Sequence, residues 1–346
     1  MAIACRVSAT AHVYNREFQK WLRWLTMNEN SRFWAAPGAA LLCQYVTWMC
    51  SVPPRVKPQT AKNYLAGVAA VVQDMGYDSP VRDHRDRPLR LLVQVWAGLK
   101  KKWATAVKHK LAVSCDMVLE IRGCPVFEPT LHNGRCYWAA VCLAAVMGLR
   151  ISEYTAVTVR GDSGEKQMRV KNIVFGVTTG GEKYFDCTVS AAKNDIARIG
   201  FTHQVWEDGS GMCPYQAMRR YWSTLPGGVD GDRPLFQLAD GKNLTRATFT
   251  NALRSGLKFA GYHPERYSAH SLRAGAAVSV ACANYGADVI KRQGRWKSSC
   301  YQEYLQFGNA FLREVQFRMT AVNGRDRQRL VGDGLVTNWN EGPWAE

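Results

Sequence analysis

The sequence predicts a mainly α-helical protein with a small antiparallel β-sheet, an α+β fold in two domains. Apolar residues recur at helical spacing in the first third of the chain and again from Tyr215 onward. Strand-like alternation is confined to a short stretch near the middle. A length of 346 residues allows two domains, and a hydrophobic content of 47% can supply two packed cores.

The first predicted domain covers residues 1–112 and is helical. Helical spacing over 12–27 places a set of apolar residues on one face: Val13, Phe18, Trp21, Leu22 and Leu25. A second helix is expected from Pro37 to just before Pro53-Pro54, because proline is tolerated at a helix start but not in its interior. Thr60 is expected to cap a third helix, and a fourth is expected over 88–103.

The second predicted domain covers residues 113–346 and follows a linker at 104–114. We expect a short helix over 115–122 and an apolar helix over 135–149, with Arg150 at the C-terminal end of the second. Strands are expected over 154–159, 170–177 and 184–189, with a fourth over 199–205, and Gly180-Gly181 suits a hairpin turn. Helices follow from Tyr215, including one over 309–322, and 324–346 is expected to be a tail.

The charge predicts a polyanionic partner. The formal net charge is +17, and lysines and arginines gain free energy by displacing counterions from phosphates. Residues 1–112 hold 17 basic against 6 acidic residues, a balance of +11, so this domain is expected to grip duplex DNA. None of the eleven cysteines forms a CxxC pair, and neither a secretory leader nor a membrane span is apparent. We therefore expect reduced thiols, no zinc site, no membrane and an intracellular location with DNA, nuclear or bacterial.

Two distant motifs hold residues suited to phosphodiester chemistry. The first is Gly148-Leu149-Arg150-Ile151-Ser152-Glu153, and the second is His270-Ser271-Leu272-Arg273, followed by Trp296, Tyr301 and Tyr304. Strand transfer needs a nucleophile, cations for two non-bridging oxygens and a proton for the leaving oxygen. Arginine suits the second task because its planar fork donates paired hydrogen bonds and stays charged. His270 and Arg273 share a helix face, and Ser268 is a plausible N-cap.

These motifs resemble the two boxes of the tyrosine recombinase (phage integrase) superfamily, over about 144–310. The first box, Gly-Leu-Arg-x-x-Glu, is matched by Gly148, Leu149, Arg150 and Glu153, and the second, His-x-x-Arg, by His270 and Arg273. Trp296 stands 23 residues after Arg273, and Tyr304 eight residues after Trp296, close to the family's spacing. The resemblance implies a helical core-binding domain followed by a tyrosine-recombinase catalytic domain.

The resemblance also implies roles. Tyr304 is the expected nucleophile, with Tyr301 as the alternative; Arg150 and Arg273 hold the phosphate, His270 assists proton transfer and Trp296 donates its indole N–H or packs behind. The family's hairpin lysine is matched by Lys193, with Lys183 and Lys166 as alternatives, and it protonates the leaving 5′ oxygen. Glu153 is expected to brace the site. No metal, nucleotide or other cofactor is implied.

The implied function is site-specific recombination of double-stranded DNA through a 3′-phosphotyrosyl intermediate, for a mobile element. By analogy with the family, a homotetramer assembles on DNA, with the helix over 309–322 packed against a neighbouring subunit or against its own. Two alternatives stay open: an enzyme like a type IB topoisomerase or a hairpin resolvase, and a catalytically inert DNA-binding derivative. A coincidental match in an unrelated helical protein is a third.

Overall fold

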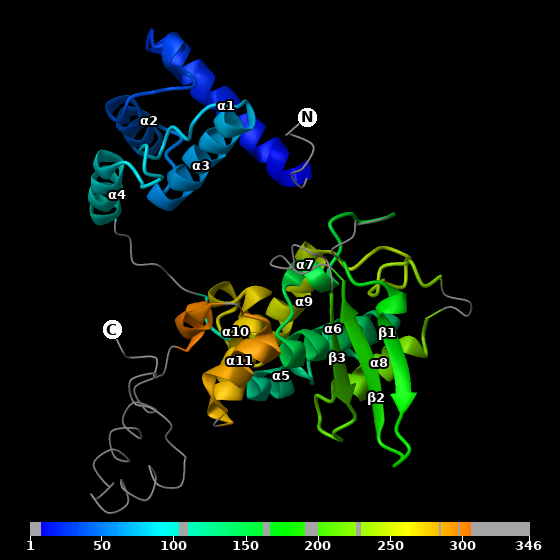
Figure 1. Ribbon diagram of the computed structural model, residues 1–346. Helices are drawn as coiled ribbons and strands as arrows, with labels where there is room; N and C mark the ends of the chain where they lie inside the picture. The colour runs from blue at the N-terminus through cyan, green and yellow to red at the C-terminus, as the bar shows by residue number, and fades with distance from the viewer. Residues whose placement is uncertain are drawn as a thin grey trace, which may run out of the picture. The chain divides into compact units, whose positions relative to one another are not determined.

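The computed structural model describes residues 8–103, 110–161, 167–190, 200–225, 230–283, 285–296 and 298–305. The chain divides into two compact units, Met1–Lys108 and His109–Glu346, which are drawn in Figure 1 and are described separately below.

The described part of the first unit is helical. Its helices are α1 (Ser8–Met27), α2 (Ala39–Ser51), α3 (Pro58–Asp74) and α4 (Arg90–Lys102), with a 3₁₀ turn, η2 (Ser31–Phe33). The core is aromatic: Trp21 and Tyr45 are fully buried, with ring centroids 4.9 Å apart. Tryptophan and tyrosine bring large apolar areas, so a few such rings can hold small helices together.

Two details of the first unit differ from the expectation. Val13 was predicted on the apolar face but is 40% exposed, because it precedes the part of α1 that contacts the core. Thr60 does not cap α3, which begins at Pro58 after Lys57. Proline is well suited to the first helical turn, since the N–H that it lacks would have no partner there, and this advantage outweighs threonine's capping oxygen.

The second unit combines helices with a three-stranded sheet. The helices are α5 (Cys115–Ile121), α6 (His132–Met147), α7 (Ile151–Tyr154), α8 (Pro214–Trp222), α9 (Arg246–Phe259), α10 (His270–Cys282) and α11 (Ala287–Gly294). The 3₁₀ segments are η3 (Pro125–Phe127), η4 (Val170–Asn172), η5 (Pro264–Arg266) and η6 (Ser299–Tyr304). None of the helices in the described ranges has both the length and the apolar character that crossing a membrane requires.

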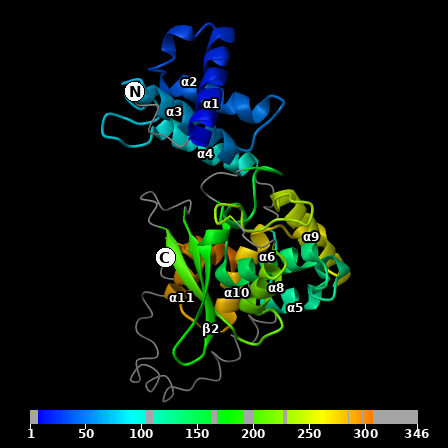
Figure 2. The same cartoon turned by 90° about the vertical axis from the view of Figure 1, so that its right-hand side faces the viewer.

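The sheet is antiparallel, in the order β1 (Ile173–Val177), β2 (Lys183–Val189) and β3 (Phe201–Trp206). Phe185 pairs with Phe175 on one side and with Val205 on the other. Along β2 the buried residues alternate as Phe185, Cys187 and Val189, which is the period of a half-buried strand. Helix α8 packs against β2 and β3, and Figure 2 shows the sheet to one side of the unit's helices. The predicted antiparallel sheet is confirmed.

The strand predicted over 154–159 is wrong. Tyr154 ends helix α7, and beyond it only Ala156 forms a single bridge, with Thr245. Val157 and Val159 are 84% and 50% exposed, so their apolar character reflects a surface loop rather than a buried strand face. The apolar helix predicted over 135–149 begins earlier and ends at Met147, where Gly148 takes a left-handed conformation with φ 55°.

The core of this unit surrounds α6, whose residues from Trp138 to Ala145 are all buried. A helix that is apolar on every side must be covered on every side, and α5, α8 and α10 contribute to that cover. The ten cysteines among the described residues are all free thiols; Cys282 and Cys300 are exposed and the others are buried or partly buried.

Candidate active site

Arg150 is held in place by Glu153, three residues further along the chain. Arg150 precedes α7, and its backbone N–H donates to Glu153 Oε2 at 2.8 Å. Its Nη1 also donates to Glu153 Oε1, at 3.1 Å. The carboxylate is 2% exposed, whereas the Arg150 side chain is 18% exposed. The buried carboxylate therefore fixes the direction of a guanidinium that still reaches the surface.

Arg273 connects three segments that are distant in sequence. It lies in α10, is 1% exposed, and donates to the carbonyl oxygens of Gly148 and Gly294. Its guanidinium carbon also lies 4.5 Å from the ring centroid of Trp296. Burying a guanidinium is tolerable when it is hydrogen-bonded, and here two carbonyls and an indole face supply that compensation. Arg273 thus brings the first motif, the second motif and Trp296 together.

His270 opens α10, one turn before Arg273, and its side chain is exposed. Desolvation by the surrounding protein lowers the pKa of His270, and the charges of Arg273, Arg150 and Arg246 lower it further. The neutral imidazole is therefore favoured near physiological pH. Ser268 does not cap α10 as predicted: the N-cap is Ala269, and the Ser268 N–H donates to Ser271 Oγ at 2.9 Å. The hydrogen bond thus runs from the segment before α10 to a side chain of its first turn, and no side chain caps the helix.

Trp296 and Tyr301 form a small apolar cluster. Trp296 is 7% and Tyr301 3% exposed, their ring centroids are 6.2 Å apart, and Ala277 and Ile290 complete the buried set. Tyr304 is the last residue of η6, and its side chain lies outside the described residues. The structure therefore places Tyr301 within a core and describes only the backbone at Tyr304.

Of the three lysines proposed to protonate the leaving oxygen, the structure describes Lys183 alone. Lys193 and its alternative Lys166 lie outside the described residues. Lys183, at the start of β2, pairs with Glu207 at 3.4 Å. Among the described residues, no group of three or more His, Cys, Asp or Glu side chains could hold a metal ion.

Two arginines near this constellation were missed by sequence reasoning. Arg246 is the first residue of α9, and its charge acts on His270. Arg295 donates from Nη2 to Glu153 Oε2 at 2.8 Å, so Glu153 is shared by Arg150 and Arg295. Arg295 directly precedes Trp296, which was the one signal that could have drawn attention to it.

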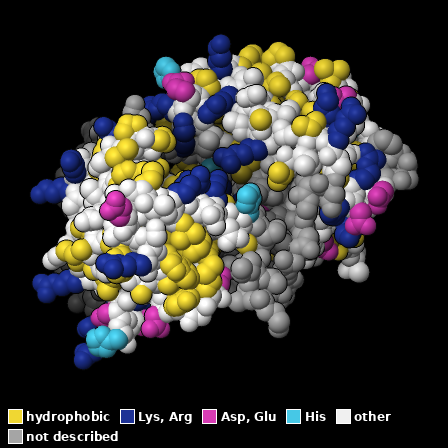
Figure 3. All heavy atoms as spheres, turned by 90° about the horizontal axis from the view of Figure 1, so that it is seen from above, with side chains coloured by type: hydrophobic (Ala, Val, Ile, Leu, Met, Phe, Trp, Pro, Cys, Tyr) yellow, Lys and Arg dark blue, Asp and Glu magenta, His cyan; other side chains and the backbone are white. Residues whose placement is uncertain are grey.

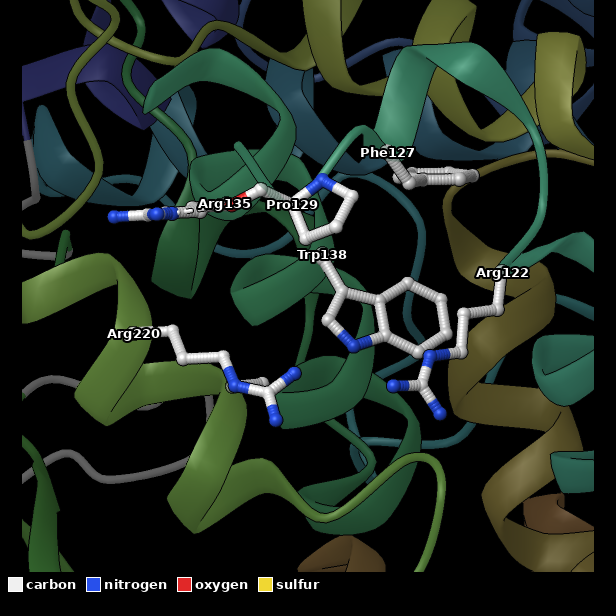
Figure 4. A pocket seen from close by; sticks show the side chains of 7 residues that line it. Arg122, Phe127, Pro129, Arg135, Trp138 and Arg220 are labelled. Carbon is white, nitrogen blue, oxygen red and sulfur yellow. Dashed lines mark hydrogen bonds between the residues drawn. The ribbon is translucent and has the colours of Figure 1, made fainter. Parts of the chain in front are cut away.

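Basic side chains also gather elsewhere. On the face drawn in Figure 3, lysines and arginines outnumber acidic side chains. A separate pocket is lined by Arg122, Arg135 and Arg220 around Trp138, between α5, α6 and α8 (Figure 4). None of the predicted catalytic residues lines that pocket. The arginines that meet at Glu153 and Trp296 are thus a distinct group.

Comparison with known proteins identifies the fold. No protein-family model matches the chain, and neither does any curated protein. Among solved structures, the chain resembles the XerH site-specific recombinase bound to palindromic difH substrate in a post-cleavage complex. The TM-score is 0.55 at 15% identity, covering 89% of this chain and 77% of that one.

A second similar structure is a lambda integrase dimer bound to a COC′ core site. The TM-score is 0.51 at 13% identity, covering 87% of this chain and 89% of that one. Both are tyrosine recombinases, so the chain has a tyrosine-recombinase fold, and the predicted fold class is confirmed.

Proposed function

We propose that this chain is a site-specific DNA recombinase that cuts and rejoins strands through a 3′-phosphotyrosyl intermediate. The observation that carries the proposal is the convergence of Arg150, His270 and Arg273 from segments more than a hundred residues apart. The positive charges of Arg150 and Arg273 favour a bound anion, and the side chains of Arg150 and His270 are exposed enough to contact it. The fold supports the same conclusion.

The proposed step is a balanced displacement at phosphorus. The Tyr304 phenol gives its proton to neutral His270 while its oxygen bonds to the scissile phosphorus, and the bond from phosphorus to the 5′ oxygen breaks. Lys193 gives a proton to that leaving oxygen, Arg150 binds the non-bridging oxygens, and the buried Arg273 adds its positive charge to their neutralisation. Rejoining reverses each transfer. The lowered pKa of His270 supports its part, because a neutral imidazole can accept a proton.

Tyr304 remains the preferred nucleophile. Tyr301 is 3% exposed and packs against Trp296, so a phosphate could reach its hydroxyl only after that cluster opened. Tyr304 ends the same 3₁₀ segment one turn later. The burial of Tyr301 supports the preference that the spacing from Trp296 suggests.

Double-stranded DNA is the proposed partner. The net charge of +17 supports it, and so do the neighbours, which are bound to a difH substrate and to a core site. The proposal includes a homotetramer on DNA, the core-binding role of residues 1–112, the catalytic role of 113–346, and a mobile-element origin.

The test begins with finding a DNA site. Duplexes that bind the full chain are selected from a random library, and the selected site is nicked near candidate phosphates to trap any covalent product. Wild type is expected to give a denaturation-resistant protein–DNA adduct. Tyr304→Phe is expected to give none, with DNA affinity within about 2-fold, because only one hydroxyl is lost. Tyr301→Phe is the matched control and should keep the adduct.

Other outcomes identify the alternatives. An adduct lost in Tyr301→Phe but kept in Tyr304→Phe would move the nucleophile to Tyr301. Site-specific binding without any wild-type adduct would indicate an inert DNA-binding derivative. Relaxation of supercoiled DNA without joining of two sites would indicate a topoisomerase-like enzyme.

A further inference from the structure

Arg295 has a backbone conformation that favours glycine. It follows α11 with φ 55° and ψ 46°. Its N–H donates to Arg292 O at 3.2 Å, and the next N–H, of Trp296, donates to Lys291 O at 2.9 Å. These two hydrogen bonds close a helix end through a left-handed residue, a position at which glycine avoids the steric cost that a side chain brings. An arginine at such a position is unusual, and the contacts of its side chain indicate why it is there.

The side chain reaches a buried carboxylate that it shares. Arg295 Nη2 lies 2.8 Å from Glu153 Oε2, and Arg150 Nη1 lies 3.1 Å from Glu153 Oε1. Arg295 is 10% and Glu153 2% exposed. One carboxylate therefore joins the arginine of the first motif to the residue beside Trp296.

Two features of Arg295 cost free energy, and its ion pair with Glu153 and the Phe201 ring, whose centroid lies 6.0 Å from the guanidinium carbon, offset part of that cost. Arg295 Nη1 is buried and, within the described ranges, has no hydrogen-bond partner. A buried, unpaired donor on a cation is unfavourable, and so is the left-handed backbone that carries it. Both costs fall on the same residue, and residues that bear such costs cluster at functional sites.

The left-handed turn sends two successive side chains to different partners. The Trp296 ring folds over Gly294, where a Cβ would lie 1.7 Å from Trp296 Cζ3, and faces Arg273. The Arg295 side chain points instead to Glu153, whose carboxylate also accepts a hydrogen bond from Arg150. The geometry of this turn therefore determines where Trp296 and the following η6 segment lie relative to Arg150 and Arg273.

We propose that Arg295 is a positioning residue for strand cleavage. Acting through Glu153, it fixes the guanidinium of Arg150, and through the turn it fixes Trp296 and the segment that ends at Tyr304. This inference rests on the proposed function, and it concerns a residue outside the motif positions discussed above.

The experiment separates positioning from folding. Arg295→Gly keeps the left-handed turn and removes the side chain, whereas Arg295→Lys keeps a cation that can reach Glu153. Adduct formation is timed in a single turnover at saturating DNA, and DNA affinity and thermal unfolding are measured on the same proteins. Arg295→Gly should cleave on the order of 10- to 100-fold more slowly, because small misplacements of reacting groups cost that much. Its DNA affinity should stay within about 3-fold, its Tm should not fall, and Arg295→Lys should recover part of the rate.

Glu29 provides a matched control in the other unit. It follows α1 with φ 58°, its N–H donates to Thr26 O at 3.2 Å, and Asn30 N–H donates to Leu25 O at 2.9 Å. Glu29→Gly therefore makes the same backbone change at the same kind of helix end, and it should cleave at the wild-type rate.

Each outcome decides the proposal. A wild-type cleavage rate in Arg295→Gly overturns it, and so does a slow rate accompanied by a lower Tm and weak DNA binding, which would show a structural role. A slow rate in Arg295→Gly with unchanged affinity and partial recovery in Arg295→Lys supports it. If wild type itself forms no adduct, the proposed function fails first, and that result is visible before any variant is compared.

Discussion

Desolvation, and after it the charges of the neighbouring arginines, set the titration of the His270 imidazole. Its pKa is lowered, so between the lowered pKa and the ordinary value of 6.5 the folded chain keeps the ring neutral while an unfolded chain would bind a proton. Acidification through that interval costs stability. Acidification removes His270 as a proton acceptor only when the pH reaches its lowered pKa, because the imidazole of the folded chain becomes protonated there.

Adduct formation should therefore persist below the ordinary histidine range. At subsaturating DNA, where the rate reports the free protein, the acid limb should have its midpoint below 6.5. His270→Gln should flatten this limb and slow the reaction by on the order of 10²-fold, the usual contribution of a positioned acid–base group. A midpoint above 6.5 would contradict the assignment.

Residue types and spacing predicted Arg150, His270, Arg273 and Trp296 as one group, but not what each would touch. The carbonyl acceptors of Arg273 arise from Gly148 and Gly294, whose approach depends on two helix ends meeting. Apart from its position before Trp296, nothing in the sequence indicated Arg295, because a left-handed arginine contradicts local preference. Lys193 and the Tyr304 side chain stay predictions.

At the scale of elements, a glycine allows α10 to contact the segment at the start of the second unit. A Cβ built on Gly275 would lie 1.7 Å from the Val113 carbonyl oxygen. In the same contact, the Val113 N–H donates to Ser271 O at 2.9 Å. At this contact the helix and the segment approach each other backbone to backbone.

Gly275→Ala should lower the free energy of unfolding of this unit by about 2–3 kcal/mol, because an extra methyl group in a closed contact forces the backbone apart. Gly98→Ala is the control: it lies exposed in α4 with nothing within 4 Å, and the gain in helix propensity should stabilise that helix by about 0.5–1 kcal/mol. Urea unfolding checks both. An equal response of the two variants would show that the contact at Gly275 is not closed.

Element types were predictable where the periodicity was strong, and errors fell at ends and loops. The helices at α1, α2, α4, α5 and α6 and the strands at β1, β2 and β3 were predicted from apolar spacing. The wrong strand over 154–159 followed from β-branched residues in a loop, since composition does not reveal whether a partner strand exists. The N-caps predicted at Thr60 and Ser268 were wrong: the observed N-caps are Lys57, three positions earlier, and Ala269, one position later.

For the whole molecule, the basic surplus predicts that affinity for the proposed DNA partner depends on salt. Affinity for a duplex should fall by on the order of 10³-fold between about 50 and 200 mM salt, as expected for a protein that neutralises several phosphates. Replacing the exposed Lys100, Lys101 and Lys102 at the end of α4 with glutamine should make the dependence on salt less steep, by about 0.9 in the logarithmic slope per lost contact. Filter binding over a salt series measures this slope, and an affinity that does not change with salt would contradict the electrostatic partner.

The two hydrogen bonds that Arg273 donates, to the carbonyls of Gly148 and Gly294, also limit where this polypeptide can be divided. A break in a loop between residues 148 and 273 would yield two pieces. The first would hold the Gly148 carbonyl without its hydrogen-bond donor, and the second would hold the buried Arg273 with only the Gly294 carbonyl as acceptor. Neither piece is a self-sufficient module. Pieces made together are expected to reassociate by re-forming these two hydrogen bonds, so split-protein reconstitution is a natural way to place the proposed activity under external control.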